Sequence, residues 1–198
     1  MSERMVMRGG ESSETPGGLL SVKHLFHGEA LRGEDEHKLF LKTSIEERMG
    51  FRIADTRLVY RFDPENKVNL HRYIDEKEQL VVVLKLSSFK YIAAYAEGFF
   101  KPKTPSRGEG MLVSLSNREC YYLSEKSRKA TVYDDYFLIF GNSEVRIKTQ
   151  EKKLFSNFGL NSNYYKNRGH GAVELLGTEN KDKREVEFEE MEIFQLIL

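Results

Sequence analysis

Short apolar blocks and runs of alternating apolar and polar residues fill the second half of the chain, a pattern typical of β-strands. Residues 79–86, with the sequence QLVVVLKL, form a continuous β-branched block that predicts a strand buried on both faces. Further strands are expected within KYIAAYAEGF, GMLVSLS and ECYYLS. Earlier in the chain, DTRLVYRF predicts a strand that has Leu58 and Tyr60 on one face.

The last predicted strand, EVEFEEMEIFQL at residues 185–196, changes the phase of its alternation halfway along. Val186 and Phe188 fall in one phase, whereas Met191 and Ile193 fall in the other. One extra residue in the Glu-Glu step between them would return both pairs to the same face, which is what a β-bulge does. A break in the strand is the alternative, but the strand-forming character of the whole segment favours the bulge.

Two helices are expected ahead of these strands. Overlapping T-x-x-E and S-x-x-E patterns within TSIEE match the capping box and predict a helix over 44–49 that ends at Gly50. Asp63 offers an N-cap and is followed by Pro64, a favoured first helical residue. Together with apolar residues at helical spacing, this pair predicts a second helix near 64–76.

The N-terminal segment, residues 1–36, is rich in Gly, Ser, Glu and Arg, so we expect a tail there and one domain over 37–198. A short apolar island that contains Leu20, Leu25 and Phe26 interrupts this composition. Three interpretations are open: a flexible tail, a docking peptide that becomes ordered on a partner, or a strand or turn added to the domain. In the second interpretation, these three side chains contact the partner.

Charge and composition narrow the classes of function. Lys+Arg and Asp+Glu each total 31, whereas a general nucleic-acid binder carries a basic excess, so neither DNA nor RNA is expected as a partner. No apolar run approaches the roughly 18 residues of a membrane helix, and the N-terminus lacks the apolar region of a signal peptide. Cys120 is the single cysteine, so an intrachain disulfide is excluded. We therefore expect a cytoplasmic protein without direct membrane insertion.

Gly141 raises the question of a phosphate-binding loop. Such loops need several closely spaced glycines that open a helix. Gly141-Asn142 is instead followed by SEVRIKTQ, in which apolar and charged residues alternate. Both dinucleotide-binding and Walker loops are therefore excluded, and Gly141-Asn142 is predicted to connect a β-hairpin, because both residue types tolerate positive φ.

Metal binding and nucleophilic catalysis have little support. His24, His27 and His37 lie in or beside the tail, but a zinc site needs three or four rigidly held ligands. Cys120 lies within a predicted strand, where a small buried hydrophobe is the simpler interpretation. We therefore expect no cofactor, no metal ion and no catalytic residue.

The loop KPKTPSRGEG, at residues 101–110, is the other candidate for partner binding. It carries Lys101, Lys103 and Arg107 and is stiffened by two prolines. One interpretation is a contact site for an acidic partner, and the alternative is an ordinary polar loop.

Taken in order, several segments resemble the TLDc domain, the module of the oxidation-resistance family. RLVYRFDPE is similar to the family's opening strand and turn, and NLHRYIDEKEQLVVVLKLSSFKYIAAYA to its helix and the following pair of strands. GMLVSLS stands at a Phe-Leu-Phe-Ser-Leu strand, YFLIFGNSEVRIKTQ at a Phe-Gly-Gly hairpin, and LFSNFGLNSNYY at a Ser-x-x-Asn-Phe-Gly segment. VEFEEMEIFQL matches the closing Leu-Glu-Val-aromatic pattern, and the resemblance covers about residues 37–198. The residues that carry the last three motifs are Gly141, Asn142, Asn157, Phe158, Gly159, Met191, Glu192 and Phe194.

The chain also departs from the family pattern. Asn142 replaces the second glycine of the hairpin, Asp63-Pro64-Glu65 replaces an Asp-Gly-Phe-like turn, and the tryptophans of the family are missing. These departures affect surface recognition by those residues and leave the core pattern intact.

The resemblance implies an α+β, mainly β fold, a two-layer antiparallel β-sandwich flanked by two or more short helices. It also implies no established catalytic mechanism, and a role in resistance to oxidative damage and in binding or regulating the V-ATPase. The expected function is thus a non-catalytic protein-interaction domain within a larger complex. Two alternatives remain: a structural component of a cytoskeletal or ciliary/axonemal (microtubule) assembly, and a thiol-dependent antioxidant enzyme that uses Cys120.

Overall fold

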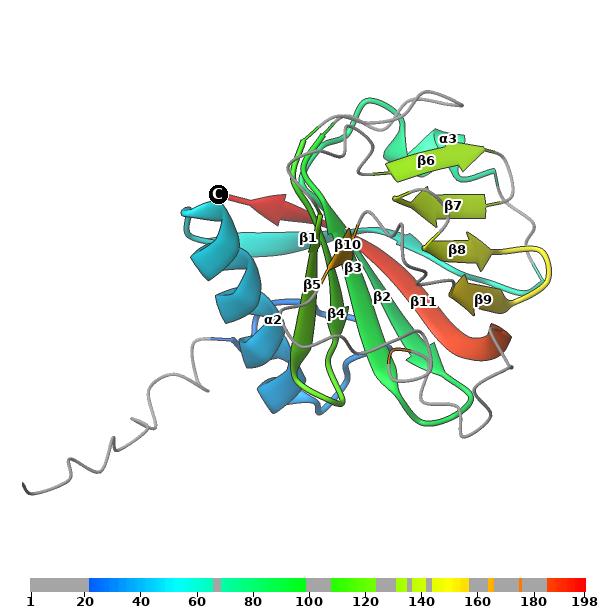
Figure 1. Cartoon of the computed structure of the whole chain (residues 1–198), viewed down its shortest axis with the longest axis horizontal. Helices are drawn as coiled ribbons and strands as arrows, with labels where there is room; N and C mark the ends of the chain where they lie inside the picture. The colour runs from blue at the N-terminus through cyan, green and yellow to red at the C-terminus, as the bar shows by residue number, and fades with distance from the viewer. Residues whose placement is uncertain are drawn as a thin grey trace, which may run out of the picture.

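The computed structural model describes a mainly β protein whose strands pair antiparallel (Figure 1). The described residues are 22–65, 69–98, 108–123, 131–134, 137–141, 144–156, 164–165, 175 and 185–198. Their strands form two sheets that share one strand. This architecture confirms the predicted antiparallel β-sandwich flanked by short helices.

The first sheet is built around a meander of four consecutive strands. These are β2 (Leu80–Leu86), β3 (Tyr91–Ala96), β4 (Gly110–Ser114) and β5 (Glu119–Leu123). Beyond β5 lies β10 (Tyr164–Tyr165), and on the other side β2 pairs with β11 (Glu185–Ile197). The edge strand β1 (Asp55–Arg61) pairs with β11.

The second sheet contains four short strands in sequence order. These are β6 (Thr131–Asp134), β7 (Phe137–Phe140), β8 (Val145–Lys148) and β9 (Lys153–Ser156). The hairpin predicted at Gly141 is confirmed, because β7 and β8 pair antiparallel and Gly141 has a φ of 68°. Its neighbour Asn142 lies outside the described residues.

Strand β11 belongs to both sheets. Residues 185–187 pair with β9, and the rest of the strand pairs with β2. The register against β2 shifts between Phe188 and Glu190, which confirms the β-bulge predicted from the change of phase. As predicted, Val186, Phe188, Met191 and Ile193 all lie in the same core.

The first sheet is buried on both faces, so the molecule has three layers (Figure 1). The inner core lies between the sheets, where Val82 and Leu84 of β2 pack with residues of β7, β8 and β9. Val81 and Val83 point to the outer face, which residues 22–31 and helix α2 (Asp35–Met49) cover. This arrangement confirms the prediction that QLVVVLKL is a strand buried on both faces.

Helix α2 begins nine residues before the predicted start at residue 44 and ends as predicted at Gly50. Gly50 adopts a left-handed φ of 74°, and its N–H donates to the Glu46 carbonyl at 2.9 Å. The predicted capping residues lie inside the helix, where the Thr43 hydroxyl donates to the Leu39 carbonyl at 2.9 Å. The prediction was wrong because burial of Leu41 and Ile45 against the sheet stabilises a longer helix than local capping indicates.

Two further expectations for the first half were wrong. Helix α3 covers only His71–Ile74, and the Glu65 N–H donates to the Asp63 carboxylate at 2.9 Å, so this aspartate forms a turn where the sequence predicted a helix start. Leu58 and Tyr60 lie on opposite faces of β1, since the register against β11 shifts between them. Tyr60 therefore reaches the inner core, whereas Leu58 is 36% exposed.

Candidate functional site

Two buried carboxylates, Glu46 on α2 and Glu192 on β11, organise polar contacts between the N-terminal part of the chain and the sandwich. Burying a charge is costly unless partners compensate it, so such groups mark positions with a defined role. We describe these two networks first and then the residues that the sequence analysis singled out.

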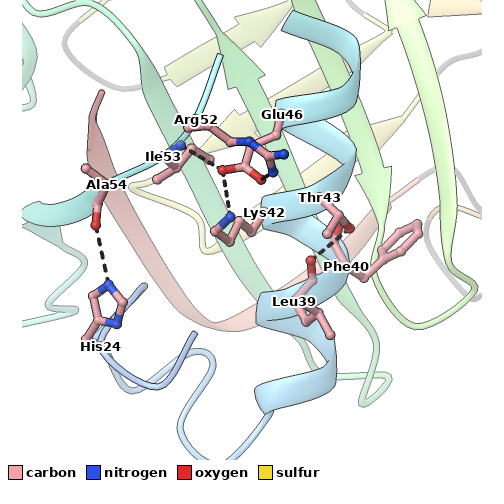
Figure 2. A network of polar contacts seen from close by, with 9 residues as sticks. All are labelled: His24, Leu39, Phe40, Lys42, Thr43, Glu46, Arg52, Ile53 and Ala54. Atoms are coloured by element: carbon pink, nitrogen blue, oxygen red, sulfur yellow. Dashed lines mark hydrogen bonds and ion pairs between the residues drawn. The ribbon is translucent and has the colours of Figure 1, made fainter. Parts of the chain in front are cut away.

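Figure 2 shows the Glu46 network at the C-terminal end of α2. Glu46 Oε1 lies 2.6 Å from Lys42 Nζ and accepts a hydrogen bond of 2.8 Å from the Ile53 backbone N–H. Arg52 Nη1 donates to Oε2 at 3.2 Å. The turn at Gly50 brings residues 52 and 53 back over the helix, so the network ties the helix to the segment that leads into β1.

The Glu46 network changes the acidity of its carboxyl group. Burial raises the pKa of Glu46, because it disfavours the charged form. The Lys42 ammonium, the Ile53 N–H and the Arg52 guanidinium act in the opposite direction and outweigh burial, so the pKa of Glu46 lies below its ordinary value of 4.5. Glu46 is therefore ionised at neutral pH and bound to three donors.

A surface depression of ≈ 400 Å³ opens beside this network. It is lined by Thr43, Glu46, Glu47, Gly50, Phe51 and Arg52. The Arg52 side chain is 89% exposed, whereas the Glu46 side chain is 5% exposed. General acid–base chemistry needs a carboxylate within reach of a substrate proton. Both carboxylate oxygens of Glu46 instead accept hydrogen bonds from its own chain, which fits a structural role.

Glu192 is the centre of the second network and has no exposed surface. Its Oε1 accepts hydrogen bonds from the Glu29 N–H at 2.9 Å and from Arg61 Nε at 2.8 Å. Its Oε2 accepts from the Ala30 N–H at 3.1 Å. A Cβ atom on Gly28 would lie 1.9 Å from Oε2, so glycine is required there for the close approach. One carboxylate thus joins β11, the edge strand β1 and the segment before α2.

The closing motif that resembles the TLDc pattern contributes to three environments. Met191 packs in the inner core, Glu192 forms the network described above, and Phe194 packs in the outer core. The Phe194 ring contacts the Phe26 ring edge to face, with centroids 5.5 Å apart. The motif therefore places side chains of β11 in the cores on both faces of the first sheet.

Two candidate partner contacts, Leu25 and Phe26, lie inside the molecule. Both are 0% exposed and pack with Val22, Ala30 and Leu31 against the outer face of the first sheet. Of the three interpretations of this apolar island, the described residues agree with a turn added to the domain. The expectation that Leu25 and Phe26 face a partner was wrong, because the apolar outer face of β11 and its neighbours buries them.

The remaining candidates are residues that lie outside the described ranges and the histidines considered for metal binding. Those outside the described residues are Leu20, Lys101, Lys103, Arg107, Asn142, Asn157, Phe158 and Gly159. Among the histidines, His24 Nε2 lies 3.4 Å from the Ala54 carbonyl oxygen, and His37 Nδ1 lies 3.1 Å from a Glu34 carboxylate oxygen. Within the part of the chain that the structure describes, no three or more His, Cys, Asp and Glu residues form a group suited to a metal ion.

Cys120 is a partly buried thiol on β5 that forms no disulfide, and it packs at the border of the outer core. Burial, followed by the neighbouring Cys120 thiol, raises the pKa of Tyr122. The Arg48 guanidinium lies 5.2 Å from the centroid of the Tyr122 ring and donates to Glu109 at 3.0 Å. The Tyr122 hydroxyl is thus neutral at physiological pH.

The sequence analysis missed both carboxylate networks. The i, i+4 spacing of Lys42 and Glu46 is a local signal for an ion pair on a helix, but the predicted helix began at residue 44 and so did not include Lys42. The contacts of Glu192 have no such signal, because their partners are remote in sequence. Likewise, nothing in the sequence around Gly28 indicates that this residue lies against a carboxylate.

Comparison of the chain with protein-family models gave no match, and no curated protein matched it. The TLDc resemblance therefore stays a prediction from the order of its motifs. Among the described helices, none combines the length and the apolar character needed to cross a membrane. The fold and the two networks define a mainly β sandwich domain whose first sheet is covered by an N-terminal segment and a helix.

Proposed function

We propose that this chain is a TLDc-like, non-catalytic protein-interaction domain that binds or regulates a large assembly such as the V-ATPase. We further propose that it contributes to resistance against oxidative damage. The order of the TLDc-like motifs supports the first part. The second part rests on the resemblance alone.

The observation that carries the proposal is the role of Glu192 in the closing motif. Its carboxylate is fully buried and bound by two backbone N–H groups and Arg61. A carboxylate held in this way fixes three chain segments relative to one another. Such rigidity suits a scaffold that presents loops for recognition, since binding residues are most often carried on loops that a rigid framework positions.

Affinity purification of the full-length protein from its native cells, with identification of the proteins that accompany it, tests the proposal. Recovery of V-ATPase subunits would support it. Recovery of tubulin or axonemal proteins would instead favour a structural role in a microtubule assembly. Recovery of the chain alone, as a free monomer, would count against both.

A further inference from the structure

Three hairpin turns of the sandwich share one backbone geometry. In each, the N–H of the fourth residue donates to the carbonyl of the first: Phe89 to Leu86 at 2.9 Å, Arg118 to Leu115 at 3.3 Å, and Lys152 to Thr149 at 3.4 Å. The fourth residue has a positive φ in all three turns, 58°, 53° and 54°. Glycine is the default residue in this conformation, because a Cβ atom is strained there.

Two of these three residues use their side chains within the molecule. The Arg118 guanidinium forms an ion pair with Glu36 of α2. The Lys152 ammonium lies 5.8 Å from the centroid of the Phe62 ring, a cation–π contact. Packing within the chain therefore explains a long side chain at both positions.

Phe89 is different. It is 76% exposed, so its ring gains little from burial while its backbone occupies a conformation in which glycine fits better. A backbone outlier of this kind points to function when the fold itself does not require the residue. An exposed aromatic ring is also the side chain type that is enriched at the centre of protein interfaces.

Hydrogen bonds to neighbouring segments hold the turn that carries Phe89. Both the N–H and the hydroxyl of Ser87 donate to the Glu187 carbonyl of β11, at 2.9 and 3.0 Å. On the other side, the Tyr91 N–H donates to the Ser116 hydroxyl in the next turn at 2.8 Å. The β2–β3 and β4–β5 turns therefore lie side by side at one end of the first sheet (Figure 1). These hydrogen bonds hold the backbone of the turn that carries Phe89 at that end.

Nearby charges distinguish between kinds of partner. Two lysines and three glutamates lie on the turn and the adjoining strands: Lys85, Lys90, Glu187, Glu189 and Glu190. Attraction to an anionic membrane requires a cluster of basic residues, and this surface has no basic excess. A protein with an apolar pocket is the partner that fits an exposed aromatic ring among mixed charges.

We propose that the Phe89 ring is an anchor that inserts into an apolar pocket of a partner protein. The proposal rests on the proposed function, because it names the surface through which an interaction domain would bind. The pocket receives the ring, and the mixed charges around the turn face the polar rim of the interface.

The test compares Phe89→Gly with Glu76→Gly in the full chain. Glu76 is also exposed and has the same φ of 58°, but it precedes β2 and so lies at the opposite end of the first sheet. With purified V-ATPase in detergent as the probe, Phe89→Gly should weaken binding by at least about 10-fold without lowering Tm, whereas Glu76→Gly should bind like the wild type. Equal binding by Phe89→Gly and wild type would overturn the proposal. A Phe89-dependent affinity for phosphatidylcholine–phosphatidylserine vesicles in place of the pump would also overturn it, in favour of a membrane.

If the wild-type chain does not bind the pump, the V-ATPase is rejected as the partner. A second experiment then tests whether Phe89 contacts a different protein. A photoreactive benzophenone side chain is placed at position 89, or at position 76 as a control, in the native cells. A cross-link at position 89 only, to a protein that after purification binds the wild type at least about 10-fold more tightly than Phe89→Gly, would support the anchor. No specific cross-link at position 89 would overturn it.

Discussion

The carboxylate of Glu192 accepts a hydrogen bond of 3.1 Å from the backbone N–H of Ala30, although the two residues are 162 positions apart in the sequence. This bond joins the last strand to the segment that precedes α2. Arg61 Nε contacts the other oxygen of the same carboxylate at 2.8 Å, so β1 is included in the junction. The N-terminal segment from residue 22 onward is therefore part of the folded domain.

Replacing Glu192 with glutamine should destabilise the protein by about 2 kcal/mol. The amide keeps one acceptor oxygen but turns an NH2 group toward a donor, so buried donors lose their partner. Glu189→Gln is the matched control on the same strand. Glu189 pairs with Lys85 in a partly exposed salt bridge, so its loss should change stability by no more than about 0.5 kcal/mol. Urea unfolding of both variants checks this, and equal losses would argue against the Glu192 junction.

Truncation of Phe26 to alanine should lower the free energy of unfolding by about 3 kcal/mol. The reason is that the ring is fully buried and contacts Phe194 edge to face. Phe89→Ala is the control. Phe26 and Phe89 both have a positive φ, but Phe89 is 76% exposed, so its replacement should change the free energy of unfolding by no more than about 0.5 kcal/mol. Thermal and urea unfolding give both values. A stable Phe26→Ala variant would mean that residues 22–36 behave as a detachable tail.

Several parts of the fold were predictable from local patterns because the determining signal lies within a few residues. The block at residues 79–86 predicted a strand covered on both faces, and β2 has the inner core on one side and α2 on the other. The phase change in the last strand predicted the bulge between Phe188 and Glu190. Burial and pleat geometry impose these patterns directly on the sequence.

Other parts were not predictable because their cause is remote. Residues 22–34 contain charged residues and glycines, and their apolar side chains are buried only because the outer face of the first sheet lies against them. Helix α2 is longer than predicted for the same reason. Of the candidate site, the Lys42–Glu46 pair has helical spacing but follows only from a helix that begins before residue 44, and the partners of Glu192 become known only once the fold is known.

Lowering the pH should reduce the stability that the Glu46 network contributes to the fold. The pKa of Glu46 is lowered in the folded state relative to its ordinary value of 4.5, so its ionisation stabilises the fold fully above about pH 4.5. That contribution is lost as the pH falls through the lower folded-state pKa. The stability difference between wild type and Glu46→Gln should therefore be constant near neutral pH and shrink below pH 4.5.

Urea unfolding at a series of pH values between about 7 and 3 measures this difference. Glu47→Gln, on the same helix, shows what the removal of one negative charge does without breaking the contacts to Lys42, Arg52 and Ile53. A difference between wild type and Glu46→Gln that persists unchanged at the acidic end would contradict the ion-pair account.

Replacing Cys120 with serine should leave any protection against peroxide unchanged. The proposed function assigns no chemistry to the thiol, which packs partly buried on β5. Cells that express the wild type or the serine variant at equal protein levels are challenged with hydrogen peroxide, and their survival is compared. Loss of protection in the serine variant would support the thiol-dependent antioxidant enzyme.

The central claim, a non-catalytic domain that binds a large assembly, is tested most directly by titrating the purified full-length chain against purified V-ATPase. Binding and ATP hydrolysis are followed together. The account predicts saturable binding and a change in the rate of ATP hydrolysis that follows the same concentration dependence. No binding and no change in hydrolysis at protein concentrations of about 100 μM would contradict it, because a specific regulatory interaction has a far lower Kd.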